Sequence, residues 1–513
     1  MRSFSKARVA AVTGRRPRWR PGGAGNVRGR KYKVSSPSRV AGVAAIVASG
    51  VICAAGPLNS TAQAGAQGLC TDSWVGPGTG TSQWYDGANW STGKIPAGTS
   101  LACINKAGTY VVVLPGYASV QSLRLGATAG NPTLEVLGAG SNAFFGSASV
   151  STVGGDGTRG TLELHPGASY YAALGGKGAF SIAPGGTLTT SGAAGAKPAY
   201  VQAHLTNQAG GTARLDAPSN IFEYGIAAVN SGSFQLPRSA ALVVESGSSF
   251  TQAGGTLALG GTLTLIGGKF VQAGGSESGG PALLEGADLV DGPGALGFDL
   301  TGVSILSGDI PSGQTVTLTT HFSDSTVFLS GSTSVKGTLA MEPSASHYVA
   351  LSGKGSLTVA SGGTLATSGP AGAQPVHIRV PLTNQAGGSV EIASPSDFEY
   401  GPATVNSGNL RVAEGGELVL SSGSTLRNAP TGTIGVTVDA TKGAVSGISG
   451  AGVSLNGTLA VTTLGSPAAG SSYVVIGGPV SGEFSASSFG HQSYSVRYTA
   501  GSVSSNEVVL TAR

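Results

Sequence analysis

An internal duplication constrains the fold of this chain more than any other feature of its sequence. Residues 160–212 align with residues 337–389 at a constant offset of 177, with 31 identities in 53 positions. The similarity continues to residue 232 in the first copy (160–232) and to residue 408 in the second (337–408). A weaker period of about 20–25 residues runs beneath the duplication, and fixed periods of this size are typical of stacked structural repeats.

Short segments of alternating apolar and polar residues fill each period, and Gly-rich turns separate them. Residues 133–137, 187–190 and 256–259 are examples, and their length and alternation are typical of strands. One coil of short strands cannot bury its own apolar face, whereas stacked coils can. We therefore predict an all-β fold, a single-stranded right-handed parallel β-helix with caps at both ends. A string of β-sandwiches is the alternative, and it would not explain the echo of Phe250-Thr-Gln-Ala-Gly-Gly at Phe270.

Composition supports a packed chain rather than a disordered or collagenous one. Hydrophobic residues make up 40% of the sequence and charged residues 10%, whereas disordered chains are poor in apolar residues and rich in charge. Gly accounts for 86 of 513 residues without a strict Gly-x-y period, which excludes collagen. Asn and Gly suit tight corners that need a positive φ, so we expect corners at four asparagines: Asn207, Asn230, Asn384 and Asn406.

The basic charge of the chain belongs to its N-terminal segment. Residues 1–64 hold 12 of the 29 Lys and Arg residues and no Asp or Glu. A long basic region precedes the apolar stretch 40–55, and Ala62-Gln63-Ala64 follows, which is the layout of a secretory signal. We predict export with cleavage between Ala64 and Gly65. An uncleaved anchor and a twin-arginine signal at Arg15-Arg16 are the alternatives.

Cysteine usage and the tryptophans predict the N-terminal cap. Cys70 and Cys103 are the cysteines left after signal removal, and in an oxidising compartment they most simply form one disulfide. All three tryptophans outside the signal lie between them. We expect a cap over 65–108, a solenoid over 109–465 and a C-terminal cap over 466–513.

Several motifs carry a resemblance to a known class of proteins. Trp84-Tyr-Asp-Gly-Ala-Asn-Trp90-Ser-Thr-Gly-Lys-Ile-Pro96 is similar to the opening segment of many bacterial secreted β-helix proteins. The recurring motifs Gly-Gly-Thr-Leu and Asn-Gln-Ala-Gly-Gly resemble the repeats of autotransporter passengers and adhesins. This resemblance implies a β-helix fold and export and implies no reaction. It departs at the C-terminus, where we expect no translocating barrel.

Polysaccharide-active β-helix enzymes need clustered carboxylates, and we identify no such cluster in the sequence. The closest acidic group, Glu285 with Asp288 and Asp291, is interpreted as a solvated link. The six histidines are scattered, and we interpret them as surface residues: His165, His204, His321, His347, His377 and His491. We expect no catalytic residue, metal or cofactor.

The strongest candidate for ligand binding is a repeated aromatic and acidic triplet. The two copies are Phe222-Glu223-Tyr224 and Phe398-Glu399-Tyr400. Repeated on one face of a rod, an aromatic ring beside a carboxylate would stack on a sugar and accept hydrogen bonds from it. The alternative is that the rings pack against the coil and the carboxylates are solvated.

These observations predict a secreted, non-enzymatic β-solenoid with a structural or adhesive role at the cell surface or outside the cell. Two alternatives stay open, a carbohydrate-active β-helix enzyme and a glycan-binding module. The expected partners are surface glycans or other extracellular proteins. We expect no nucleic acid partner and no membrane span once the signal is removed.

The signal layout gives a first prediction. The secreted chain should begin at Gly65, because signal peptidases cleave after a small-x-small site such as Ala62-Gln-Ala64. Intact-mass measurement of secreted material tests this, and a mass that includes residues 1–64 would contradict it.

Overall fold

The computed structural model describes residues 69–223, 225–421, 423–450, 452–500 and 506–513. The predicted signal and its cleavage site at Ala64 and Gly65 lie outside these residues. Within them the chain is built of short strands and one 3-10 turn, η1 (Gly87–Asn89). The described helices include none with the length and apolar character needed to span a membrane.

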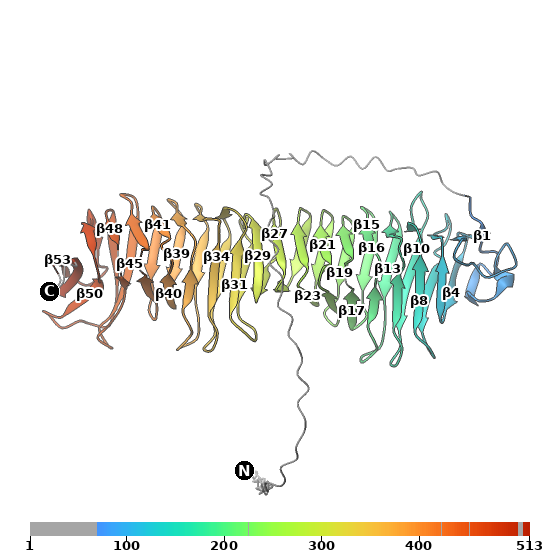
Figure 1. Ribbon diagram of the computed structural model, residues 1–513, viewed down its shortest axis with the longest axis horizontal. Helices are drawn as coiled ribbons and strands as arrows, with labels where there is room; N and C mark the ends of the chain where they lie inside the picture. Colours follow the sequence, from blue (N-terminus) through green and yellow to red (C-terminus); the bar gives the residue numbers. More distant parts are fainter. Residues whose placement is uncertain (1–68, 224, 422, 451, 501–505) are drawn as a thin grey trace, which may run out of the picture. The chain divides into compact units, whose positions relative to one another are not determined.

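The strands form a solenoid in which each coil contributes a strand to each of up to three faces (Figure 1). Face 1 contains β1 (Asp72–Ser73), β3 (Leu101–Ile104), β6 (Ser122–Leu125), β9 (Ser151–Val153), β12 (Phe180–Ile182), β15 (Leu205–Asn207), β18 (Ala227–Asn230), β21 (Ser249–Gln252), β24 (Lys269–Gln272), β27 (Asp288–Asp291), β29 (Val303–Gly308), β31 (Ser325–Leu329), β34 (Val349–Gly353), β37 (Val376–Ile378), β40 (Pro395–Phe398), β43 (Glu417–Leu420), β47 (Ile448–Gly450) and β50 (Ser472–Ile476).

Face 2 is made of two sheets. The first contains β2 (Thr79–Gln83), β4 (Thr109–Leu114), β7 (Thr133–Gly138), β10 (Gly160–Pro166), β13 (Gly186–Thr190), β16 (Thr212–Leu215), β19 (Ser233–Leu236), β22 (Thr256–Leu259) and β25 (Ser276–Gly279). The second contains β32 (Thr333–Val335), β35 (Leu357–Val359), β38 (Leu382–Asn384), β41 (Ala403–Asn406), β44 (Thr425–Asn428), β48 (Val453–Leu455) and β51 (Val480–Gly482).

Face 3 completes each coil. It contains β5 (Tyr117–Val120), β8 (Ala143–Ser147), β11 (Ala172–Gly175), β14 (Ala199–Val201), β17 (Ser219–Phe222), β20 (Ala241–Val244), β23 (Thr262–Ile266), β26 (Ala282–Glu285), β28 (Phe298–Thr301), β30 (Thr315–Thr319), β33 (Thr338–Glu342), β36 (Thr364–Thr367), β39 (Ser389–Ile392), β42 (Asn409–Val412), β45 (Thr433–Asp439), β49 (Thr458–Leu464) and β52 (Ala486–Ser488).

Strands of one face pair in parallel with the strands one coil before and one coil after. Thr161 to Leu164 of β10, for example, pair with Thr133 to Val136 of β7 on one side and with Thr187 to Thr190 of β13 on the other. The predicted fold, a right-handed parallel β-helix, is therefore confirmed. The sandwich alternative is excluded because neighbouring coils pair in parallel along the whole stack.

Alternate residues of each strand point inward and form one continuous apolar core. The buried cluster runs from Trp74 in the first coil to Ala512 in the last strand. Rings at successive coils contact one another, as Phe250 does with Phe270 at a centroid distance of 5.5 Å. Each fully buried side chain of this size contributes about 1.5–3 kcal/mol, so the interior is the main source of stability.

Face 2 is interrupted in the middle of the stack, and the duplication changes face across it. Residues 292–297 join β27 directly to β28, and residues 309–314 join β29 to β30. Ile310 nevertheless bridges in parallel to Val335 of β32, so the chain still passes the same side. The 177-residue offset moves each strand along the stack by a whole number of coils and, in addition, onto the next face. Strand β10 of the first copy lies on face 2, whereas its counterpart β33 lies on face 3.

The asparagines predicted at corners lie at the ends of strands, but without the predicted backbone conformation. Among the described residues, positive φ outside glycine occurs at Asp156 and Tyr400, so the expected positive φ is wrong. The Asn207 and Asn384 side chains instead begin two buried ladders inside the solenoid. Asn207 Nδ2 donates to Asn230 Oδ1 at 2.8 Å, and Asn384 Nδ2 donates to Asn406 Oδ1 at 2.7 Å. Each ladder pairs buried amides where strands end, because identical side chains stack in register.

The N-terminal end is closed by the first coil. Strands β1 and β2 already pair in parallel with β3 and β4, so stacking begins inside the segment expected to be a separate cap. Trp74, Trp84 and Trp90 are buried in this coil, and Trp84 packs edge to face on Phe145 at 5.6 Å. Cys70 and Cys103 form the predicted disulfide.

The C-terminal end departs from the parallel pattern. Strand β46 (Ala444–Ser446) pairs antiparallel with β45. Strand β54 (Asn506–Ala512) pairs antiparallel with both β50 and β53 (Tyr494–Ala500). Strand β54 thus lies against the last parallel strand of face 1, where an uncovered edge would invite association with other chains.

The first coil gives a second prediction. Cys70→Ser with Cys103→Ser removes roughly 3–4 kcal/mol of loop constraint in the chain-entropy model. Solenoid stability is close to a sum of coil and interface terms, so the loss should stay local. We expect circular dichroism to show a folded rod while tryptophan emission shifts to the red and light scattering rises. Unchanged emission and scattering would show that the disulfide does not hold the first coil.

Candidate functional site

The repeated triplets do not present both of their aromatic rings to solvent. Phe222 and Phe398 are fully buried at the ends of β17 and β40. Neither ring can stack on a ligand, because both belong to the inward row that fills the core, so this part of the prediction is wrong. Tyr224 lies outside the described residues. Tyr400 has a side chain that is 80% exposed and a positive φ of 63°.

The two triplets also lie on different faces. Glu223 follows β17 on face 3, whereas Glu399 follows β40 on face 1. The expectation that both triplets lie on one face of the rod is therefore wrong, because the duplication offset includes a change of face. The two sites are therefore separate and have different neighbours.

The second copy brings together a dense group of charged and aromatic side chains. His377 lies on β37, in register with Asp397 on β40. His377 Nδ1 is 3.0 Å from Glu399 Oε1 and 3.7 Å from Asp397 Oδ2. Arg379 Nε donates to Glu399 Oε2 at 2.9 Å, and the guanidinium lies over the Tyr400 ring at 5.3 Å. We call these four residues and Tyr400 the His377 cluster.

Burial and neighbouring charges set the electrostatics of the His377 cluster. Burial raises the pKa of Asp397, His377 opposes this rise, and the nearby Glu399 and Glu417 add to it. The pair of carboxylates is accordingly asymmetric. Glu399 accepts a hydrogen bond from the guanidinium of Arg379, whereas the pKa of Asp397 is raised above its ordinary value.

The first copy has a different composition at the equivalent positions. Tyr200 replaces His377, and Gln202 replaces Arg379. Gln202 Nε2 donates to Glu223 Oε2 at 2.6 Å. The pKa of Tyr200 is raised by burial and then by Glu223, Glu245 and Tyr171, and burial together with Glu223 raises the pKa of Glu245. The first copy thus lacks the imidazole and the guanidinium that the second copy has at these two positions.

An aromatic strip on face 3 continues the first copy toward the N-terminus. We define the strip as Tyr117, Phe144, Tyr171 and Tyr200. Tyr117 pairs in register with Phe144, and their rings stack at 5.0 Å with an interplanar angle of 10°. Tyr171 and Tyr200 meet edge to face at 5.4 Å. A Cβ atom at Gly175 would lie 2.7 Å from the Phe144 ring, so glycine there makes room for the ring against the sheet.

The acidic group around Asp291 is not a solvated link. Glu285 ends β26, and Asp288 and Asp291 begin and end β27. Asp291 is only 6% exposed, and its Oδ1 accepts from Gln314 Nε2 at 3.1 Å. Burial raises the pKa of Asp291 to about 7. The interpretation as a link is wrong because β27 belongs to face 1, where Asp291 takes the inward position that asparagine and glutamine hold in earlier coils.

Sequence reasoning missed the grouping of histidine with carboxylates. His377 and Asp397 are 20 residues apart, which is one coil, and Glu399 lies two residues after Asp397, just beyond the end of β40. These two spacings were the sequence signal that could have revealed the grouping of the histidine with the two carboxylates. A second group of the same kind, Glu135 with Glu163 and His165, lies on face 2. Both groups have ligand atoms within 4.8 Å of one another and the residue types that hold a metal ion.

Comparisons with known proteins report likeness at the level of fold. No family model and no curated protein matches the chain. The Haemophilus influenzae Hap adhesin is similar over 81% of this chain and 64% of its own length, at 10% identity and a TM-score of 0.21. The TibC-catalyzed hyper-glycosylated TibA55-350 fragment is similar over 72% of this chain and its whole length, at 14% identity and a TM-score of 0.18. The chain thus spans less than two thirds of the adhesin. The fold assignment itself comes from the strand pairing, and it agrees with the resemblance to autotransporter-passenger-like β-helix proteins.

Asp291 gives a third prediction. Its folded-state pKa of about 7 lies above the ordinary 3.8, so the folded chain binds this proton more tightly than the unfolded chain. The stability from this group is full below about pH 4, declines as the pH rises and is lost above about pH 7. In Asp291→Asn the side chain at this position is uncharged at every pH. We expect this variant to melt at a higher temperature than the parent at pH 8 but not at pH 4.

Asp288→Asn is the matched control for this prediction. Asp288 lies on the same strand but is only partly buried. Melting curves recorded by circular dichroism at pH 4 and pH 8 measure how far each variant shifts the melting temperature from that of the parent. An equal effect of Asp291→Asn at pH 4 and pH 8 would contradict the assignment of a raised pKa to this carboxyl.

Proposed function

We propose that this chain is an extracellular, non-enzymatic β-solenoid that acts as an adhesive rod. The observation that supports the proposal best is the aromatic strip, Tyr117, Phe144, Tyr171 and Tyr200. The rings form two contacting pairs, Tyr117 with Phe144 and Tyr171 with Tyr200. Ala173 separates Phe144 from Tyr200 in the strand register, and the sheet holds both pairs on face 3, where adjacent strands are about 4.8 Å apart. Exposed aromatic surface of this kind is typical of binding sites.

The surroundings of the strip favour a glycan as the partner. Tyr117 is 67% exposed and offers ring surface to the apolar face of a sugar. Glu223 and Glu245 lie one coil apart beside Tyr200, since their neighbours Phe222 and Val244 pair in register. Carboxylates accept hydrogen bonds from sugar hydroxyls. The strip therefore combines stacking with hydrogen-bond acceptors along successive coils.

A second candidate function, polysaccharide cleavage, is favoured by the His377 cluster. Asp397 and Glu399 have carboxylate oxygens within 4.8 Å of each other, close to the separation of about 5–5.5 Å used by retaining glycosidases. The raised pKa of Asp397 suits a general acid. In this alternative Asp397 would protonate the leaving group and Glu399 would act as the nucleophile, although Arg379 holds that carboxylate.

Retention on polysaccharides tests the adhesive proposal. The purified chain is passed over immobilised acidic and neutral polysaccharides, and both retention and released products are measured. We expect retention without product, and loss of retention in Tyr117→Ala with Tyr200→Ala. Phe322→Ala is the matched control, because Phe322 is 79% exposed but lies outside the strip. Equal retention of the strip variant and the parent would contradict the proposal.

Glu223→Gln with Glu399→Gln distinguishes the two candidate functions. The adhesive proposal assigns no bond cleavage to either carboxylate, so any turnover measured should stay the same in this variant. A reducing-sugar assay and a circular dichroism spectrum check activity and folding together. Loss of turnover with an intact fold would establish the enzymatic alternative.

A further inference from the structure

We propose that Glu135, Glu163 and His165 form a binding site for a divalent transition-metal ion such as Zn²⁺. The three side chains lie on face 2, outside the aromatic strip and the His377 cluster. Their ligand atoms lie within 4.8 Å of one another. This inference departs from the sequence-based expectation of no metal, because the group forms only when the coils stack.

The register of the two strands creates the need for a cation. Glu135 of β7 pairs directly with Glu163 of β10, so two carboxylates point outward from the same position of adjacent coils, about 4.8 Å apart. Like charges directly opposite each other destabilise a sheet. His165 lies two residues beyond Glu163 on the same side of β10, and its Nδ1 is 2.8 Å from Glu135 Oε1. The group thus joins two negative charges to one imidazole.

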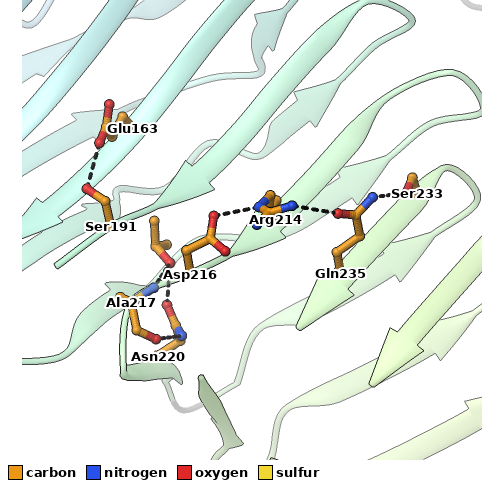
Figure 2. A network of polar contacts seen from close by, with 9 residues as sticks. Glu163, Ser191, Arg214, Asp216, Ala217, Asn220, Ser233 and Gln235 are labelled. Atoms are coloured by element: carbon orange, nitrogen blue, oxygen red, sulfur yellow. Dashed lines mark hydrogen bonds and ion pairs between the residues drawn. The ribbon is translucent and has the colours of Figure 1, made fainter. Parts of the chain in front are cut away.

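Arg214 is the nearest arginine in the row of register partners that contains Glu135 and Glu163, and it pairs with other residues. Glu163 is followed along the row by Thr189 and then by Arg214, two coils away. Figure 2 shows Arg214 between Asp216 and Gln235, with its dashed lines running to these two residues. Its Nε donates to Asp216 Oδ2 at 2.6 Å, and its Nη1 donates to Gln235 Oε1 at 3.3 Å. Arg214 therefore does not neutralise the two glutamates.

The donor set selects the class of metal. Imidazole nitrogen suits Zn²⁺ and its transition-metal neighbours, whereas Ca²⁺ and Mg²⁺ prefer oxygen ligands alone. Zn²⁺ binds nitrogen at about 2.0–2.1 Å and carboxylate oxygen at about 2.0–2.2 Å, so the three atoms must draw together slightly. His165 is 41% exposed in its side chain and has room to move. Three protein ligands leave a further position open to solvent.

A hydrogen bond from the next coil orients one ligand. Ser191 Oγ donates to Glu163 Oε1 at 2.6 Å (Figure 2). Partners of this kind fix the direction of a metal-binding carboxylate. Ser191 therefore has the role of a positioning residue, and it links the site to a third coil.

The His377 cluster has the same residue types but is a weaker candidate. Arg379 already pairs with Glu399 at 2.9 Å, so a second cation there would meet a positive charge. Around Glu135 and Glu163 the ion pair that the structure contains is the one with His165. Binding at the face 2 site should therefore exceed binding at the His377 cluster.

Zinc titration of the full purified chain tests the proposal. The chain is prepared without a polyhistidine tag, stripped with EDTA and titrated with ZnCl₂ by calorimetry, with CaCl₂ in a parallel titration. We expect saturable Zn²⁺ binding that weakens at least about tenfold in His165→Ala and in Glu163→Gln, since loss of a positioning residue alone typically costs about 10–100-fold. Ser191→Ala should weaken binding less than His165→Ala.

His347→Ala is the matched control. His347 is 34% exposed in its side chain and faces a single carboxylate, Asp324, at 3.4 Å, so its loss should leave the affinity unchanged. His377→Ala reports on the competing cluster. Zn²⁺ binding that disappears in His377→Ala but not in His165→Ala would overturn the proposal. So would an absence of binding at 100 µM Zn²⁺, or Ca²⁺ binding as tight as Zn²⁺ binding, with the fold intact by circular dichroism.

Discussion

Parallel pairing between successive coils is the interaction on which the rest of this structure depends. Each strand donates and accepts backbone hydrogen bonds with the strands above and below, so no coil satisfies its backbone alone. The pairing also fixes register, which places each residue over its counterpart one coil away. Side chains therefore act in rows along the rod. The inward rows make one core from Trp74 to Ala512, and the outward rows bring side chains of adjacent coils into contact.

Stacking in register repeats each side-chain interaction from coil to coil, whether that interaction is favourable or unfavourable. The buried amides Asn384, Asn406 and Asn428 form a ladder in which the first two each donate to the next. In the same way rings of the aromatic strip pack in pairs between neighbouring coils. A carboxylate repeated in register, as at Glu135 and Glu163, instead accumulates charge. The fold thus favours ladders of amides and rings, whereas a ladder of like charge is unfavourable unless a group of opposite charge lies beside it.

The sequence predicted the solenoid and the disulfide because both follow from local signals, the repeat period and the even cysteine count. It did not predict the sites, because they form between residues one coil apart whose register the sequence alone leaves open. Phe222 and Phe398 were assigned outward although the strand alternation puts them inside. Asp291 was assigned to a link because it was interpreted without its row, in which Gln272 and Gln252 precede it in the same inward position.

Because the duplication offset moves each strand onto a different face, the two copies have different surroundings. Strand for strand the copies agree, yet β17 lies on face 3 and its counterpart β40 on face 1. Equivalent side chains therefore meet different neighbours. Tyr200 packs against the Tyr171 ring, while His377 at the equivalent position pairs with Asp397 and Glu399. The same ancestral segment supplies two unlike surfaces, because in a solenoid the function of an outward residue is set by the adjacent coils as much as by its own strand.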